Sequence, residues 1–157
     1  MENQTLEIKA ALQIQKPVGE VFEAIVDPAK MSNYFISEST GRMEEGKQLN
    51  WSFPEFEGAF PVRIGKIEAN RYISYYWDVE DKELLVEMTL TPKENNSTLV
   101  TITEKSMPNN EAGMNWLKGN TEGWANFLAC LKAYLEYGIN LRKGAFDYLK
   151  NTEAPIA

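Results

Sequence analysis

Carboxylates are the side chains of this sequence that could support acid–base chemistry, because its 157 residues contain no histidine. Without histidine the chain lacks the usual general base near neutral pH and the commonest transition-metal ligand. Serine–histidine and cysteine–histidine hydrolases are therefore excluded, as are zinc motifs that pair histidine with cysteine or glutamate. Aspartates and glutamates occur singly rather than at calcium-loop spacing, so we expect no metal and no cofactor.

Four charged residues are candidates for chemistry inside a buried cavity. Asp78 and Glu104 lie near the ends of predicted strands, whereas Glu87 and Arg63 have outward parity on the expected register. A buried carboxylate can act as an acid or base without histidine. A register slip of one residue would reverse these faces, so an enzyme of the cyclase or dehydratase type stays open. No residue is assigned as catalytic.

Aromatic and large apolar side chains are the stronger signal, because many of them have inward parity on strands or lie on the apolar side of a helix. They either fill a core or line a cavity for an apolar guest, which the Tyr75 and Tyr134 hydroxyls would orient. The expected lining is Trp51, Phe53, Phe60, Tyr75, Trp77, Met88, Trp116, Trp124, Phe127 and Leu131. The expected entrance is Met31, Tyr34 and Phe35, together with the loop from Pro54 to Phe60.

The element that must hold these side chains is an amphipathic helix through Thr121–Gly138. Its periodicity predicts a helix from near Glu111 to Tyr148, with breaks or bends at Gly138 and Gly144. The lone cysteine, Cys130, lies on the helix flank, where we expect a half-buried, unreactive side chain.

Alternating apolar and polar residues predict a sheet for this helix to cover. A first strand over Leu6–Ile14 is followed by two short helices, one ending at Asp27-Pro28 and one over Pro28–Phe35. Further strands are predicted over residues 38–43, 48–53, 60–68, 72–79, 83–91 and 97–105. The sequence thus predicts one α+β domain over residues 1–157, with its core over about 6–149. In it, a curved antiparallel sheet of about seven strands wraps around the long C-terminal helix.

Charge and hydropathy limit the partners of this domain. The formal net charge is −7, which repels phosphate backbones and anionic membranes, so we expect no nucleic acid partner. No apolar run approaches the roughly 18 to 20 residues that a membrane span needs. The first ten residues lack the pattern of a signal peptide, so we expect a cytoplasmic location.

Four stretches carry a resemblance to a known family: Ile14–Phe35, Gly41–Phe53, Gly65–Asp78 and Glu122–Gly138. In this order they resemble the SRPBCC superfamily, and within it the small bacterial homologues of the C-terminal domain of the heat-shock-chaperone ATPase activator. The similarity covers nearly all of residues 6–140. It implies a helix-grip fold, as in the birch-pollen allergen and START domains, with a cavity between sheet and long helix.

Two departures from that family bear on function. The family usually has tryptophan at the end of the second short helix, where this chain has Tyr34-Phe35, so a different entrance contact is expected. The eukaryotic activator also has a separate N-terminal domain that does much of the chaperone binding, and 157 residues leave no room for it.

Three hypotheses of function follow. The first is a non-enzymatic module that binds a small hydrophobic or amphipathic ligand, lipid-like or polycyclic aromatic. The second is a chaperone partner with a part in the stress response, acting through acidic strips at Glu80–Glu83 and Glu44-Glu45; such strips are also typical of solvated turns. The third is the cyclase or dehydratase that uses the same cavity.

Overall fold

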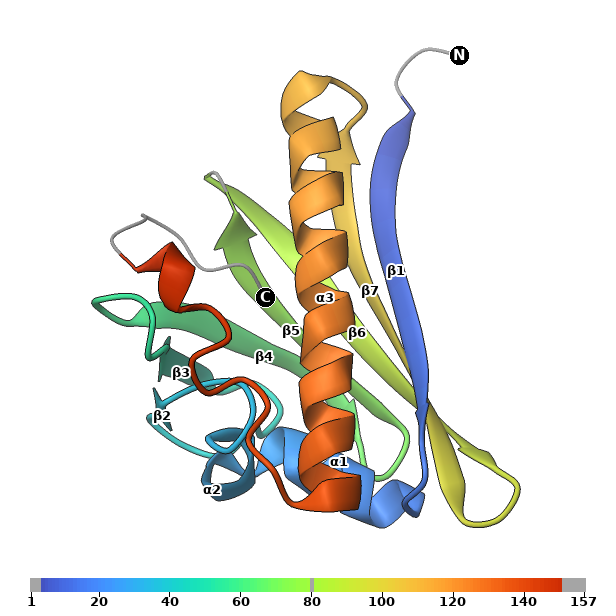
Figure 1. Cartoon of the computed structure of the whole chain (residues 1–157). Coiled ribbons are helices and arrows are strands. Elements are labelled where there is room, and N and C mark those ends of the chain that lie inside the picture. Colours follow the sequence, from blue (N-terminus) through green and yellow to red (C-terminus); the bar gives the residue numbers. More distant parts are fainter. Residues whose placement is uncertain (1–3, 80, 151–157) are drawn as a thin grey trace.

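The computed structural model of the chain describes residues 4–79 and 81–150, so Glu80 of the predicted acidic strip lies outside the described residues. Within these residues the fold is α+β (Figure 1). The elements in chain order are β1 (Thr5–Ile14), α1 (Val18–Val26), α2 (Pro28–Met31), β2 (Glu38–Ser39), β3 (Gln48–Ser52), β4 (Phe60–Glu68), β5 (Tyr72–Val79), β6 (Lys82–Lys93), β7 (Ser97–Pro108), α3 (Glu111–Tyr137) and the 3-10 helix η1 (Asp147–Leu149).

The described strands form one antiparallel sheet of seven, in the order β1-β7-β6-β5-β4-β3-β2. The strands from β2 to β7 follow one another as a meander, and β1 joins beside β7. The sheet curves around α3, which runs across its concave face (Figure 1). This confirms the predicted curved sheet and its long C-terminal helix.

Two predicted elements are shorter than their sequence patterns indicate. The second short helix ends at Met31 rather than at Phe35, and residues 32–35 form turns. Strand β2 ends at Ser39 rather than near Met43, because the Met43 amide hydrogen-bonds to the Val26 carbonyl of α1 and draws the chain off the sheet. In contrast, β7 continues to Pro108, beyond the predicted end at Lys105.

Helix α3 begins at a side-chain cap and ends at a glycine. The Asn110 side chain accepts a hydrogen bond from the Gly113 amide at the first turn. At the other end Gly138 has φ 68°, a left-handed conformation that closes the helix after Tyr137. The prediction of a helix to Tyr148 is therefore wrong, although Gly138 is indeed the break. Residues 139–150, here called the strap, fold back beside the turn that follows α2 and the loop that follows β3.

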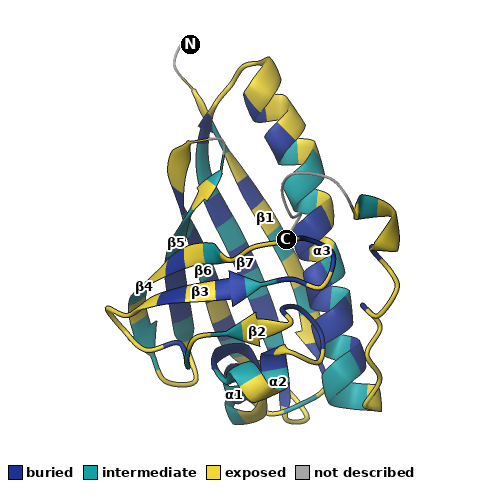
Figure 2. Ribbon diagram, turned by 90° about the vertical axis from the view of Figure 1, so that its left-hand side faces the viewer, coloured by how far each residue is buried: buried dark blue, intermediate teal, exposed yellow. Residues whose placement is uncertain are grey.

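The core lies between α3 and the concave face of the sheet, where buried residues gather (Figure 2). Trp124, Phe127 and Leu131 of α3 have no exposed surface. The sheet's inner face contributes alternate residues, such as Val100 and Ile102 of β7. Helix and sheet thus bury the apolar faces that the alternation predicts.

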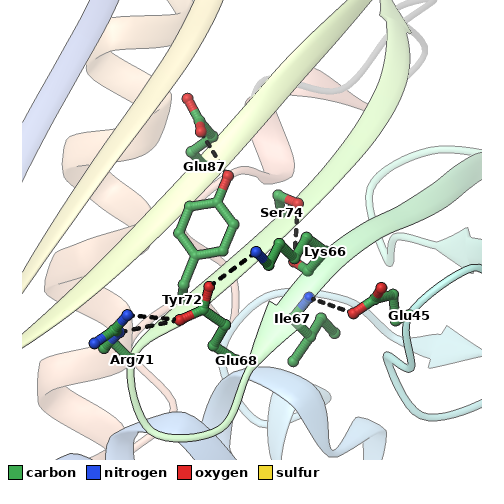
Figure 3. Close-up of polar contacts among 8 residues, drawn as sticks. All are labelled: Glu45, Lys66, Ile67, Glu68, Arg71, Tyr72, Ser74 and Glu87. Atoms are coloured by element: carbon green, nitrogen blue, oxygen red, sulfur yellow. Dashed lines mark hydrogen bonds and ion pairs between the residues drawn. The ribbon is translucent and has the colours of Figure 1, made fainter.

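The outer face of β4, β5 and β6 carries a polar network (Figure 3). The Tyr72 hydroxyl donates to Glu87 at 2.5 Å, and Glu68 pairs with both Lys66 and Arg71. Burial, with the hydrogen bond to Glu87, raises the pKa of Tyr72 to about 12. Glu87 therefore faces away from α3, as predicted.

Candidate functional site

A buried carboxylate, Glu104 of β7, lies at the centre of the interface between sheet and helix. It has no exposed surface and shares the inward parity of Val100 and Ile102. Its Oε1 accepts hydrogen bonds from Trp124 Nε1 at 2.8 Å and Asn120 Nδ2 at 3.1 Å, and its Oε2 accepts one from Trp77 Nε1 at 2.9 Å. One carboxylate thereby joins β5, β7 and α3. Among the described residues no Lys or Arg forms an ion pair with it.

Aromatic rings surround Glu104 and contact one another across the interface. The centroids of Trp77 and Trp124 are 5.9 Å apart, and that of Trp51 lies 6.3 Å from Trp77 and 5.1 Å from Tyr75. Rings at these separations are in contact. The sheet and α3 therefore meet through their aromatic side chains.

Two polar groups inside this interface have no hydrogen-bond partner among the described residues. They are the hydroxyl of Tyr75 and Nε1 of Trp116, and both residues are buried. Burial, together with the charge of Glu104, raises the pKa of the Tyr75 hydroxyl well above its ordinary value. The hydroxyl is therefore a hydrogen-bonding group inside an otherwise aromatic environment.

Phe35 connects this interior to the rim of the fold. The centroid of its ring lies 4.8 Å from that of Phe127, 5.8 Å from that of Trp51 and 6.3 Å from that of Trp124. The neighbouring Tyr34 donates its hydroxyl to the Ala24 carbonyl at 2.9 Å, and burial raises its pKa well above the ordinary value. Both side chains are buried in the turn that follows α2.

The strap closes over Phe35 through a buried ion pair. Arg142 Nη2 lies 3.0 Å from Oε1 of Glu55, and the two side chains are only 5% and 3% exposed. The guanidinium also lies over the rings of Phe35, Phe53 and Phe146. Sequence reasoning missed this pair because it placed Arg142 on a continuing helix. The glycines that bracket Arg142, Gly138 and Gly144, indicate that the helix breaks, but they do not identify Glu55 as the partner of Arg142.

A pocket of about 370 Å³ opens between the strap and the turn after α2. Its apolar wall is formed by Tyr34, Phe35, Ile36 and Pro54. Its charged wall is formed by Glu55, Arg142, Lys143, Asp147 and Lys150. The expected entrance residues Tyr34 and Phe35 and the start of the 54–60 loop therefore line one pocket, although Met31 does not.

Most of the predicted lining residues come together. Phe35, Trp51, Phe53, Phe60, Tyr75, Trp77, Trp124 and Phe127 form one network of ring contacts. Met31, Met88, Trp116 and Leu131 are buried as well.

The remaining candidates lie apart from this interior. Asp78 is exposed on β5, and Arg63 and Glu83 pair with each other at 3.1 Å on the surface. Glu44 pairs with Lys47, and the Glu45 side chain accepts from the Ile67 amide. Cys130 is buried rather than half-buried, because it lies on the covered side of α3, and burial raises the pKa of its thiol.

Two general features of the described residues bear on the class of site. They contain no group of three or more Cys, Asp or Glu side chains placed to hold a metal ion. None of the helices in residues 4–79 and 81–150 is long and apolar enough to cross a membrane.

Comparison with known proteins gives a family and a fold. The family model described as Activator of Hsp90 ATPase homolog 1-like protein matches residues 15–136. The crystal structure of protein SSP2350 from Staphylococcus saprophyticus is 33% identical with a TM-score of 0.77, over 87% of this chain and 96% of that one. No curated protein matches the chain.

Two more distant structures show the fold alone. DynU16, from the dynemicin biosynthetic locus, is 24% identical with a TM-score of 0.75, over 85% of this chain and 48% of DynU16. The Aha1 dimer from Colwellia psychrerythraea is 17% identical with a TM-score of 0.71, over 85% of this chain and 98% of that one.

Proposed function

This chain belongs to the family of Activator of Hsp90 ATPase homolog 1-like proteins, and we propose that it binds a small apolar or amphipathic ligand, lipid-like or polycyclic aromatic. One observation carries the proposal: the strap pocket shares Phe35 with the aromatic network around Glu104. A guest in the pocket therefore lies one side chain away from the interior.

Movement of Phe35 is the step that would connect the two spaces. Its ring contacts Trp51, Trp124 and Phe127, so a ligand that displaces it replaces those contacts with its own. In the interior the Tyr75 hydroxyl and the Trp116 indole nitrogen offer hydrogen bonds that the described residues leave unused. The polar end of an amphipathic guest would find its partners there or at the charged wall of the pocket.

Titration of the indole groups tests this function. The chain has four tryptophans, whose indole N–H signals can be followed by nuclear magnetic resonance against a library of lipids and polycyclic aromatics. We expect at least one compound to shift the signals of Trp51 and Trp124, and Phe35→Leu to change its affinity several-fold. Tyr137→Leu, at a side chain that is 70% exposed, is the matched control. If no library member shifts an indole signal, the proposal fails.

An enzyme of the cyclase or dehydratase type is a second candidate, and the burial of Glu104 beside Tyr75 favours it. A carboxylate inside an aromatic site can move a proton to or from a bound substrate. Glu104→Gln would abolish turnover of such a substrate while leaving its binding measurable. If turnover persists in Glu104→Gln, Glu104 is not the proton carrier.

A chaperone partner is the third candidate, and the name of the matched family supports it. In that role we propose that this chain acts in the cytoplasm, as part of the stress response. An ATPase assay of an Hsp90-type chaperone, with and without this chain, tests the candidate. Unchanged ATPase activity together with no co-purification would remove it.

A further inference from the structure

The charges around the strap pocket do not balance. Glu55 is paired with Arg142 at 3.0 Å, and Asp147 with Lys150 at 3.4 Å. The fifth charged group, the ammonium of Lys143, forms no ion pair within residues 4–79 and 81–150. The described residues that line the pocket therefore carry one excess positive charge, on a chain whose net charge is −7.

Arg142 has unused hydrogen-bonding capacity at the same place. A guanidinium has five N–H donors, and Nη2 donates to Glu55. Its Nε is buried and has no partner among the described residues. Buried N–H groups almost always have an acceptor, so an acid oxygen that entered beside Arg142 would supply the one that this donor lacks.

The pocket also has an apolar wall. Tyr34, Phe35, Ile36 and Pro54 form it, and the Arg142 guanidinium lies 5.6 Å from the centroid of the Phe35 ring. A volume of about 370 Å³ is within the range of small-molecule sites. A guest that fills the pocket therefore meets both cationic groups and aromatic rings.

From this arrangement we infer that the ligand is an amphipathic acid with a single negative charge, such as a carboxylic acid on a flat apolar body. Its acid group is held by Lys143 and the Nε of Arg142, and its apolar body lies against Tyr34 and Phe35. This inference rests on the proposed ligand-binding function and names the chemical class of that ligand. A cationic ligand would be repelled by Lys143, and a dianion would leave one negative charge without a partner.

Glu55 is the residue that opposes binding of an acid. Its replacement therefore tests whether acid affinity rises, as the inference requires. Its carboxylate already neutralises Arg142, so an incoming acid competes with it for the guanidinium. Glu55→Gln removes the competitor and leaves the guanidinium in need of an anion. We therefore expect Glu55→Gln to bind an acid about tenfold more tightly than the unchanged protein does.

Titration calorimetry with 1-naphthaleneacetic acid and 1-naphthaleneacetamide separates charge from shape, because the two probes differ only in the acid group. We expect the unchanged protein to bind the acid about tenfold more tightly than the amide. Lys143→Gln, at an exposed position, should reduce this ratio at least threefold, because it weakens binding of the acid more than binding of the amide. Lys118→Gln removes the same charge from an exposed site on α3 outside this pocket, and it should leave the ratio unchanged.

Three results would overturn the inference. They are equal binding of acid and amide, an equal effect of Lys143→Gln and Lys118→Gln, and no gain of acid affinity in Glu55→Gln. In each of these cases ligand binding itself stands, because a probe is bound. Binding of neither probe also overturns it, whereas the broader function is then decided by the indole titration with the library.

Discussion

The indole Nε1 of Trp124 donates a hydrogen bond of 2.8 Å to Oε1 of Glu104, and this bond ties the middle of α3 to β7. The same carboxylate accepts from Trp77 of β5, so it links two strands and the helix that covers them. Because these three elements meet at one side chain with no exposed surface, its removal affects both stability and the geometry of the proposed site.

Replacement of Glu104 by glutamine should destabilise the protein by about 2 kcal/mol. The amide group of glutamine would direct its own N–H donors at the N–H donors that now point at Glu104, so at least one bond is lost. Glu7→Gln on the exposed side of β1 is the control and should change the free energy of unfolding by less than about 0.5 kcal/mol. Urea unfolding followed by tryptophan fluorescence measures both, and equal effects would contradict the prediction.

The Arg142–Glu55 pair should behave as a buried pair in a double-mutant cycle. Arg142→Met alone leaves a buried carboxylate without its partner and should destabilise the protein by about 3 kcal/mol, whereas Arg142→Met with Glu55→Gln should recover part of that loss. The exposed Arg63–Glu83 pair, whose side chains are 49% and 50% exposed, provides the parallel cycle and should show about 0.5 kcal/mol of coupling. Similar coupling in both cycles would mean that the strap is not held by its buried pair.

Glu136 should make stability depend on pH in acid. Burial opposes its ionisation, but hydrogen bonds from the Gln15 amide and the Lys132 ammonium outweigh burial and hold the pKa of Glu136 below 4.5. The unfolded state therefore takes up the proton first as the pH falls. The stabilisation is complete above 4.5 and is lost as the pH falls through the lowered folded pKa.

Glu136→Gln tests this dependence. It should lower the free energy of unfolding by about 1 kcal/mol at pH 7, where the ionised carboxylate accepts both hydrogen bonds. The loss should be smaller at acid pH, as the pH falls through the lowered folded pKa of Glu136. Urea unfolding at neutral and at acid pH measures the difference, and Glu122→Gln at an exposed position of the same helix is the control. A loss of the same size at both pH values would exclude the ionised carboxylate as its source.

Two glycines of α3 should respond to alanine in opposite directions. A Cβ at Gly113 would collide with the carbonyl oxygen of Pro108, so Gly113→Ala should destabilise the protein or displace the start of the helix. A Cβ at Gly119 would meet no atom within 4 Å, so Gly119→Ala should stabilise the helix by up to about 1 kcal/mol. Thermal unfolding measures the stability of both variants. If both changes in stability have the same direction, the contacts described for one of the two glycines are contradicted.

The strands and their meander could be predicted because strand alternation and short turns are local properties of the sequence, whereas the place of β1 beside β7 was not predicted. The same alternation that turns Val100 and Ile102 inward also turns Glu104 inward. The sequence pattern ends this strand at Lys105 and therefore predicts Glu104 near a strand end. In fact β7 continues to Pro108 by pairing with β1, and that pairing depends on residues about 100 positions away.

The path of the strap could not be predicted from local sequence patterns. The helical spacing of apolar residues continues past Tyr137, and it alone predicts a longer helix. The left-handed Gly138 ends that helix, but the path that follows depends on Arg142 reaching Glu55 in a loop far back in the chain. A contact of this kind leaves no periodic signal in either segment. For the same reason the pocket that the strap completes could not be predicted.

The pairing of β1 with β7 also sets an order of events during synthesis. Thr5 lies opposite Pro108, so the first strand leaves the ribosome about 100 residues before its partner exists. At about 5 to 20 residues per second, β1 waits between roughly 5 and 20 seconds with its backbone groups unpaired. During that interval the nascent chain can build the hairpins from β3 to β6, whereas the pairing of β1 has to wait for β7, the last strand.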